Sequence, residues 1–352
     1  EYRHLADLLG QVEVVVVGLL DDFVPLMRSN DGIMIQKYYE GTPKVINLSV
    51  EVGKLIGIVD STYLRTPKTN LRRENRIKTI QSSLMIEGNT LSLDQVTAIF
   101  ENKRIIGPAK DIKEVQNAIE VYSNLRNFDP YSEESYLSAH RMLMSGLVDD
   151  AGKYRTKGVG IFKGEEVAHM APPAWNVSNL MGNLFSYLKE SDDNKIVKSC
   201  VFHYEMEFIH PFMDGNGRMG RLWQTLILMQ ENPVFEYLPM EIEIKNNQEK
   251  YYKALSESDK EGLCTKFVEF MLEMIKISLS ELIDDQRKSF SDEERLQYFK
   301  EQTDLNEFSR KDYLRVFKDI STATATRDLK KGVDLGILRK KGENRLAKYT
   351  FQ

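Results

Sequence analysis

The residues with the clearest chemical potential lie between positions 210 and 221, in the run His-Pro-Phe-Met-Asp-Gly-Asn-Gly-Arg-Met-Gly-Arg. This run joins an apolar helical pattern that ends near Phe208 to another that starts near Asn216. A glycine-rich loop that opens a helix presents unpaired backbone N–H groups and the positive end of the helix dipole. The sequence therefore predicts an anion-binding site suited to phosphate.

Charged side chains within the run match phosphoryl chemistry. Arg218 and Arg221 fall on the first helical turns, where both can clamp phosphate oxygens through charge-assisted hydrogen bonds. Asp214 is a hard oxygen ligand at the edge of the loop, suited to Mg²⁺ shared with a polyphosphate, and Asn216 adds a neutral donor. These residues indicate a site for a magnesium-bound nucleotide.

A candidate base begins the same run. The ordinary pKa of histidine, about 6.5, lets His210 accept a proton from an attacking hydroxyl near neutral pH. Phe212 is the apolar member of the loop and is predicted to anchor it. A single His, Asp or Arg is more often a surface or core group, and a lone glycine turn often only caps a helix. The conjunction of all twelve positions favours the nucleotide site.

The run resembles the signature of the Fic family, His-x-Phe-x-(Asp/Glu)-Gly-Asn-Gly-Arg-x-x-Arg, at every specified position. The resemblance covers roughly residues 70–285, including Gly152-Lys153-Tyr154-Arg155 and His203. It implies a mainly helical protein that uses Mg-ATP to attach AMP to Ser, Thr or Tyr side chains of proteins.

The resemblance also implies a role for each matched residue. His210 would be the base and Asp214 the Mg²⁺ ligand. The expected ATP-binding residues of the loop are Gly215, Asn216, Gly217, Arg218, Met219, Gly220 and Arg221. Tyr251, Tyr252 and Asp259 look like the family's nucleotide-side helix, where an aromatic would line the adenosine pocket, although a tyrosine pair on a helix is more often core or surface.

A second pattern, Ser83-Leu84-Met85-Ile86-Glu87-Gly88-Asn89, ends a helix expected near residues 72–88. It resembles the inhibitory motif of many Fic proteins, (Ser/Thr)-x-x-x-Glu-(Gly/Asn). The resemblance implies that Glu87 pairs with Arg221 and keeps this arginine from the ATP γ-phosphate. The alternative is that Glu87 merely precedes a helix C-cap.

The expected fold is mainly helical, with a catalytic domain at 71–285 and a mixed, unassigned segment at 1–70. Helices are expected near 92–103, 111–127, 132–146, 176–190, 194–208 and 262–284. The glycine-rich, β-prone segment Val159–Pro173 predicts a hairpin flap that holds the target segment by strand addition. His140, His169 and His203 are expected to be structural.

Residues 284–295 read as a charged linker to a winged helix-turn-helix unit at 295–352. Helices are expected at 309–317 and 322–332, and two strands within 338–349. Basic residues on the second helix and wing are Arg327, Lys330, Lys331, Arg339, Lys340, Lys341, Arg345 and Lys348. They suggest DNA as a partner, although many winged helices make only protein contacts.

Composition limits the class of protein. A chain of 352 residues with 41% hydrophobic and 29% charged residues suits a globular protein, and a net charge of −5 argues against polyanion binding over the whole surface. No run approaches the roughly 18 apolar residues of a membrane helix. Two cysteines without CxxC spacing suggest neither a disulfide nor a zinc site, so a cytoplasmic location is expected.

Together, residues and resemblance predict a protein adenylyltransferase that uses ATP and Mg²⁺ and is inhibited by Glu87. One alternative is a DNA-binding regulator whose site only senses ATP; another is a Fic enzyme that removes AMP or transfers a different nucleotide. His210 favours an enzyme, because a sensor needs no base. Expected partners are an unidentified target protein and the chain itself, through self-modification or a homodimer.

Overall fold

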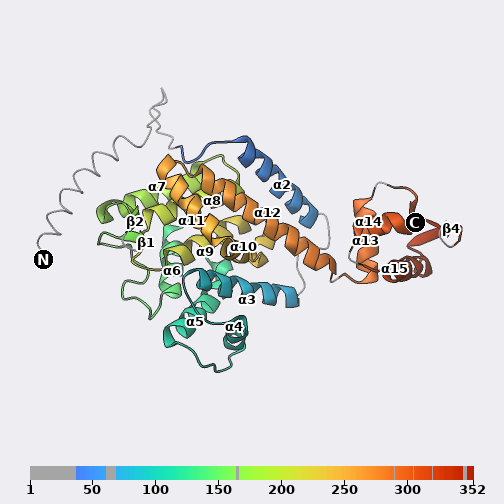
Figure 1. The fold of residues 1–352 in the computed structure, drawn as a ribbon, viewed down its shortest axis with the longest axis horizontal. Helices are drawn as coiled ribbons and strands as arrows, with labels where there is room; N and C mark the ends of the chain where they lie inside the picture. The colour runs from blue at the N-terminus through green and yellow to red at the C-terminus, as the bar shows by residue number, and fades with distance from the viewer. Residues whose placement is uncertain are drawn as a thin grey trace, which may run out of the picture.

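The structure is a computed structural model that describes residues 37–60, 69–163, 166–288, 290–303, 305–318, 320–343 and 347–352; side chains at 160–170 and 287–289 are outside the description. A helical body extends along α12, and a smaller C-terminal unit follows it (Figure 1). Residues 1–36 and 61–68 of the expected N-terminal segment, and Arg345 of the expected wing, lie outside the described residues.

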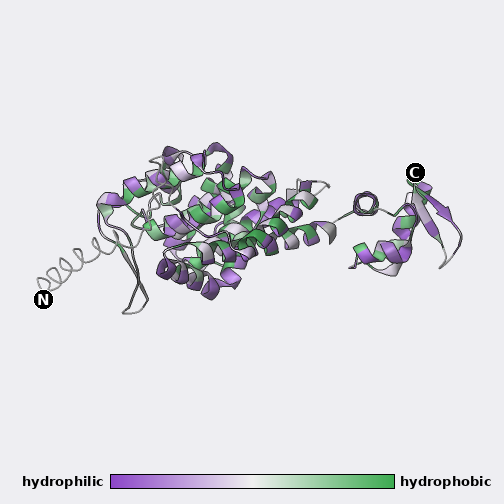
Figure 2. Ribbon diagram, turned by 90° about the horizontal axis from the view of Figure 1, so that it is seen from above, coloured by the Kyte–Doolittle hydropathy of each residue, from purple (hydrophilic) through white to green (hydrophobic). Residues whose placement is uncertain are grey.

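Two helices at the centre of the body hold the candidate loop. Both α8 (Lys195–Ile209) and α9 (Asn216–Met229) are buried along most of their length. One apolar cluster packs α8 against α2 (Pro43–Asp60) and α12 (Thr265–Lys288), and a second packs α8 and α9 against α5 (Ala109–Ser123). Figure 2 shows the hydrophobic residues concentrated between the helices. Each buried apolar side chain contributes about 1.5–3 kcal/mol to stability, so the many that α8 and α9 bury fix the positions of these two helices. The loop between them is therefore held at both ends.

The other helices surround this centre. They are α3 (Thr69–Ile86), α4 (Leu93–Phe100), α6 (Glu133–Leu143), α7 (Val177–Glu190), α10 (Met240–Asn246) and α11 (Gln248–Glu261), with 3-10 turns η2 (Leu125–Asn127), η3 (Ala174–Asn176) and η4 (Pro233–Tyr237). The mainly helical fold expected from the sequence is confirmed. Among the described helices, none combines the length and apolar character needed to cross a membrane.

Two segments are more helical than the sequence suggested. The unassigned stretch Pro43–Asp60 forms α2, which starts at a proline, a residue that the first helical position tolerates. The prediction that residues 284–295 form a linker is wrong, because α12 continues to Lys288 and α13 (Asp292–Gln302) begins after Ser291. Ser291 and Glu294 form a capping box there. The charged residues that suggested a linker lie instead on the solvent-facing surfaces of these helices.

The expected hairpin is present within residues 159–173. Strand β1 (Gly160–Lys163) pairs antiparallel with β2 (Glu166–Met170), and the register shifts between Ile161 and Phe162. The Ala171 N–H donates to the Val159 carbonyl at 3.2 Å and closes the base. The hairpin closed by this bond is the flap expected from the sequence.

The C-terminal unit has the two helices and the hairpin expected from the sequence. Its elements after α13 are β3 (Phe308–Ser309), α14 (Arg310–Val316), α15 (Thr322–Asp334), β4 (Leu338–Lys341) and β5 (Lys348–Phe351), in the sheet order β3-β5-β4. Asp328, only 1% exposed, accepts two hydrogen bonds from Arg295, at 2.7 and 2.9 Å, and one from Tyr313, at 3.1 Å. This buried pair ties α13 and α14 to α15, while the winged-helix assignment stays a prediction.

We expect Asp328→Ala to destabilise the C-terminal unit by about 3–5 kcal/mol, because it leaves the Arg295 guanidinium without its buried counter-ion. Urea unfolding followed by hydrogen exchange over residues 292–352 measures this loss. Lys330→Ala, an exposed position on the same helix, is the control and should change stability by less than about 0.5 kcal/mol. Equal effects of the two variants would contradict the assignment.

Candidate active site

The candidate base ends the central helix α8. His210 adopts the left-handed conformation, φ 50° and ψ 60°, and its N–H donates to the Met206 carbonyl at 2.9 Å. For a residue other than glycine this conformation costs about 1–2 kcal/mol. His210 Nδ1 lies 3.4 Å from the Glu207 carbonyl oxygen. With the proton on Nδ1, Nε2 carries the lone pair that a general base needs.

The loop after His210 is fixed by a side-chain network. The Asn216 amide accepts from the Phe212 N–H and donates to the Phe212 carbonyl, both at 2.9 Å. The Phe212 ring, fully buried, stacks on His140 at a centroid distance of 3.5 Å. His140 Nδ1 accepts from the Gly152 N–H at 2.8 Å, and Nε2 lies 3.0 Å from the Asp214 carbonyl. The loop is therefore preorganised before any ligand arrives.

His140 needs the neutral ring for this role. Its pKa is lowered to about 4, chiefly by burial; the hydrogen bond to the Asp214 carbonyl acts to raise the pKa, and nearby Arg218 acts to lower it. A neutral ring accepts at Nδ1 and donates at Nε2, and a protonated ring would lose the bond from Gly152. The sequence predicted a structural role for His140 but gave no sign that it positions this loop.

Two glycines admit atoms that a side chain would exclude. Gly215 has φ 89°, and a Cβ there would lie 2.8 Å from Met144 Sδ. A Cβ on Gly217 would collide with the carboxylate oxygen of Glu87 and lie 3.1 Å from Arg221 Nη1. Glu87 thus reaches the first turn of α9, where backbone N–H groups and the helix dipole favour an anion.

Arg218 and Asp214 form one side of the site. Arg218, only 4% exposed, donates to Glu114 at 3.0 Å and to Asp214 Oδ1 at 2.9 Å. Asp214 Oδ1 also accepts the Gly215 N–H at 2.6 Å, and its side chain is 44% exposed. One exposed carboxylate at the mouth fits a Mg²⁺ that takes its other ligands from phosphates and water. Among the described residues, no cluster of three or more His, Cys, Asp or Glu is placed to hold a metal ion.

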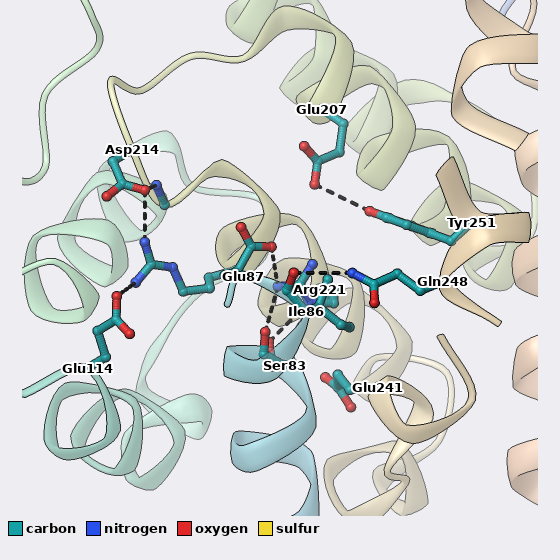
Figure 3. Close-up of polar contacts among 12 residues, drawn as sticks. Ser83, Ile86, Glu87, Glu114, Glu207, Asp214, Arg221, Glu241, Gln248 and Tyr251 are labelled. Carbon is teal, nitrogen blue, oxygen red and sulfur yellow. Dashed lines mark hydrogen bonds and ion pairs between the residues drawn. The ribbon is translucent and has the colours of Figure 1, made fainter. Parts of the chain in front are cut away.

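Arg221 and Glu87 form the other side, shown in Figure 3. Arg221, only 1% exposed, donates through Nε to Ser83 Oγ and through Nη2 to the Ser83 carbonyl, each at 3.0 Å. Nη2 also donates to Glu87 Oε1 at 2.7 Å. Burial alone would lower the pKa of Arg221, but the Glu87 carboxylate holds it above its ordinary value. The carboxylate therefore sits on the guanidinium that the resemblance assigns to phosphate.

A second acidic residue near Arg221 was not found from the sequence. Glu241 on α10 is 1% exposed, and Tyr122 donates to its Oε1 at 3.4 Å. Burial raises the pKa of Glu241 to about 7, and Arg221 acts in the opposite direction. In the part of the chain that the structure describes, Glu241 Oε2 and Arg221 Nη1 are both buried without a hydrogen-bond partner. No local sequence pattern marks this residue.

Two loop residues expected to bind ATP have a packing role. The Met219 side chain is fully buried in the core, and its N–H donates to the Gly215 carbonyl at 3.0 Å. A Cβ on Gly220 would lie 2.6 Å from Met206 Cε, so this glycine lets α9 approach α8. The side chain of Met219 and the Cα of Gly220 thus serve packing, and the expected contact of these two residues with ATP stays a prediction.

The residues expected on the nucleotide-side helix are separated by burial. Tyr251 is 1% exposed, and its hydroxyl lies 3.1 Å from His203 Nε2 and donates to Glu207 at 3.4 Å. Its ring belongs to the core, so the expectation that it lines a pocket is wrong. Tyr252 is 49% exposed and accepts from Gln248, which also donates to the Ile86 carbonyl. Asp259 accepts from Tyr204 on α8 at 2.8 Å. Of the two tyrosines, Tyr252 keeps an exposed aromatic face, and Gln248 links it to the end of α3.

Comparison with known proteins decides the family. Residues 130–228 match the family model described as Fic/DOC family. A crystal structure of a Fic family protein from Desulfovibrio desulfuricans G20 is 40% identical to this chain, with a TM-score of 0.68 over 90% of this chain and 98% of that chain. The chain belongs to the Fic/DOC family.

Relatives of this Fic protein carry names that describe an activity. Protein adenylyltransferase fic-1 of Caenorhabditis briggsae is 30% identical over 247 residues, which cover 62% of this chain and 46% of that protein. A probable protein adenylyltransferase of Aquifex aeolicus (strain VF5) is 29% identical over 189 residues, covering 50% and 53%. The chain thus spans about half the length of the curated relatives it matches.

We expect His140 to make the stability of the Fic body depend on pH. Its folded pKa, about 4, lies below the ordinary 6.5, so protons bind the unfolded chain first as the pH falls. The contribution of the neutral ring is therefore complete above about pH 6.5 and is lost toward about pH 4, an effect of roughly 3 kcal/mol. Urea unfolding measures it.

His140→Gln removes this titration and is the matched variant. The difference in unfolding free energy between wild type and variant should shrink from about pH 7 to about pH 4.5. Other titrating groups, such as Glu241, are present in both proteins and cancel in the difference. A difference that stays constant with pH would show that His140 does not titrate as described.

Proposed function

We propose that this chain is a protein adenylyltransferase that transfers AMP from ATP to a Ser, Thr or Tyr hydroxyl of a target protein and is inhibited in cis by Glu87. One observation carries the proposal: a carboxylate occupies the anion site at the N-terminus of α9, bonded to buried Arg221 at 2.7 Å. An acidic side chain there competes directly with a phosphate oxygen. The names of the relatives support the same activity.

Each residue of the loop has a separate role in the proposed reaction. Backbone N–H groups of the first turn of α9, with Arg218 and Arg221, would bind the polyphosphate. Asp214 would hold Mg²⁺, which when bound neutralises charge on the phosphates. His210 Nε2 accepts the hydroxyl proton while the hydroxyl oxygen bonds to the α-phosphorus and pyrophosphate leaves. The flap would align the target by strand addition.

Glu87→Gly should increase AMP transfer by about tenfold or more, since it releases Arg221 and the first turn of α9 for phosphate. In that background, His210→Ala should reduce transfer by about 10²–10⁴-fold. The assay incubates purified protein and lysate with labelled ATP and identifies the mass added to modified residues. It also scores self-modification, transfer of another nucleotide and loss of AMP from a modified protein.

Glu231→Gly is the matched control, because Glu231 is an exposed glutamate just after the end of a helix, α9. It should leave transfer unchanged. If Glu87→Gly binds ATP but transfers no AMP, the adenylyltransferase proposal fails, and an ATP-sensing role becomes the better interpretation. If Glu87→Gly and wild type transfer AMP equally, only the inhibition by Glu87 is contradicted.

We also propose that the C-terminal unit binds duplex DNA. The exposed faces of α15 and β4 carry Arg327, Lys330, Arg339, Lys340 and Lys341. Lys331, which the sequence placed among these cations, instead pairs with Asp292 at 2.9 Å and Glu293 at 3.1 Å. A helix and a hairpin that both carry exposed cations suit phosphate contacts along a groove.

Replacing both Arg327 and Lys330 by Ala should weaken duplex binding and reduce the slope of log affinity against log salt by about 2. Fluorescence anisotropy with a labelled duplex, at several salt concentrations, measures both quantities. Lys331→Ala is the control and should change the slope little, because its charge is already paired. Absence of binding by the unmodified protein at low salt would remove DNA as a partner.

A further inference from the structure

Arg155 is a buried cation that the proposed reaction does not use directly. It lies between α6 and the flap, is 2% exposed, and its guanidinium donates to four backbone carbonyl oxygens. Nε donates to His210 at 2.8 Å, and Nη2 donates to Ile209 at 3.2 Å. Nη1 donates to Lys157 at 2.9 Å, and Nη2 also donates to Pro172. These contacts come from three separate stretches of the chain.

The four carbonyls lie at both ends of the flap and at the turn that carries the base. Lys157 precedes strand β1, and Pro172 follows strand β2. Ile209 and His210 end α8, where carbonyl groups lack helical partners. The Arg155 N–H adds a bond to the Pro211 carbonyl at 2.8 Å, immediately after the base. One residue thus joins the base of the flap to the catalytic turn.

The chemistry of the side chain suits this position. A guanidinium presents five N–H donors in a rigid plane, so it fixes the relative directions of the carbonyls that it binds. Its positive charge also faces the negative end of the α8 dipole. Burial lowers the pKa of Arg155, because desolvation disfavours the charged guanidinium. His210 holds a strained left-handed conformation, which these hydrogen bonds help to maintain.

We infer that Arg155 is a positioning residue that fixes the distance between the flap and His210, so that a hydroxyl held by the flap meets the base. The inference rests on the proposed adenylyl transfer. None of the described side-chain hydrogen bonds of Arg155 goes to residues 214–221. Loss of the guanidinium should therefore lower the rate of transfer and leave nucleotide affinity intact.

The test compares Arg155→Gln and Arg155→Lys in the Glu87→Gly background. The lysine variant keeps the charge but loses the planar fork, so it should retain the fold and an ATP Kd within about twofold. Its kcat for AMP transfer should fall by about 10²-fold, because small displacements of reacting groups cost that much. Hydrogen exchange should become faster at the amides of Ala171 and His210, which close the flap base and the end of α8.

Arg76→Gln in the same background is the matched control. Arg76 is another largely buried arginine that donates to a backbone carbonyl, that of Tyr122, and to the Glu236 carboxylate at 2.9 Å. Its loss should lower the melting temperature while kcat stays within about threefold. A structural role for Arg155 alone would give the same result as Arg76→Gln, with unchanged kcat.

Each outcome decides the inference. If Arg155→Gln does not fold, Arg155→Lys is the deciding variant, and a lysine variant with unchanged kcat overturns the inference. If the Glu87→Gly parent binds ATP but transfers no AMP, the proposed function fails independently of Arg155. In that case hydrogen exchange decides: unchanged protection of Ala171 and His210 in Arg155→Lys overturns the positioning role, and faster exchange supports it.

Discussion

A buried guanidinium, that of Arg221, sets the condition that the rest of the site must meet. It is 1% exposed, and a buried charge without a partner costs several kcal/mol. An anion beside Arg221 therefore stabilises the fold, and in this structure the anion is the Glu87 carboxylate. A nucleotide phosphate can take that place only by displacing Glu87. In the proposed function, inhibition and phosphate binding are therefore two occupancies of one electrostatic site.

The helix that precedes Glu87, α3, is bonded to the rest of the helical body. Asn75 donates to the Tyr237 carbonyl at 3.0 Å and Arg76 donates to Glu236 at 2.9 Å, so α3 is held against η4. Glu87, in contrast, lies just beyond the last helical residue and is followed by Gly88 with φ 89°. Its side chain is 31% exposed. Displacement of the carboxylate can therefore be local, without detachment of α3.

The sequence predicted the features that are encoded within short stretches. The run at 210–221 is local, so its anion site and the adjacent helices were predicted from spacing. The pairing of Glu87 with Arg221 was implied by the family resemblance of a second short motif. His140, Arg155 and Glu241 gave no such signal for their roles, because their partners lie far along the chain. The error at Tyr251 has the same origin, since only the packing of α11 on α8 determines which tyrosine is buried.

Because the loop is rigid, the parts of the site that can change position lie outside it. His140 holds the Asp214 carbonyl, Asn216 closes the turn at Phe212, and the end of α8 is bonded to Arg155. A loop fixed from three directions gains little from rearranging when a ligand binds, because its donors already point into the site. The Glu87 carboxylate is not held by this network, and the flap is tied to the network only at its base, through Arg155. In the proposed mechanism, Glu87 then decides whether a phosphate enters the site, and the flap presents the target, while the chemistry between them stays constant.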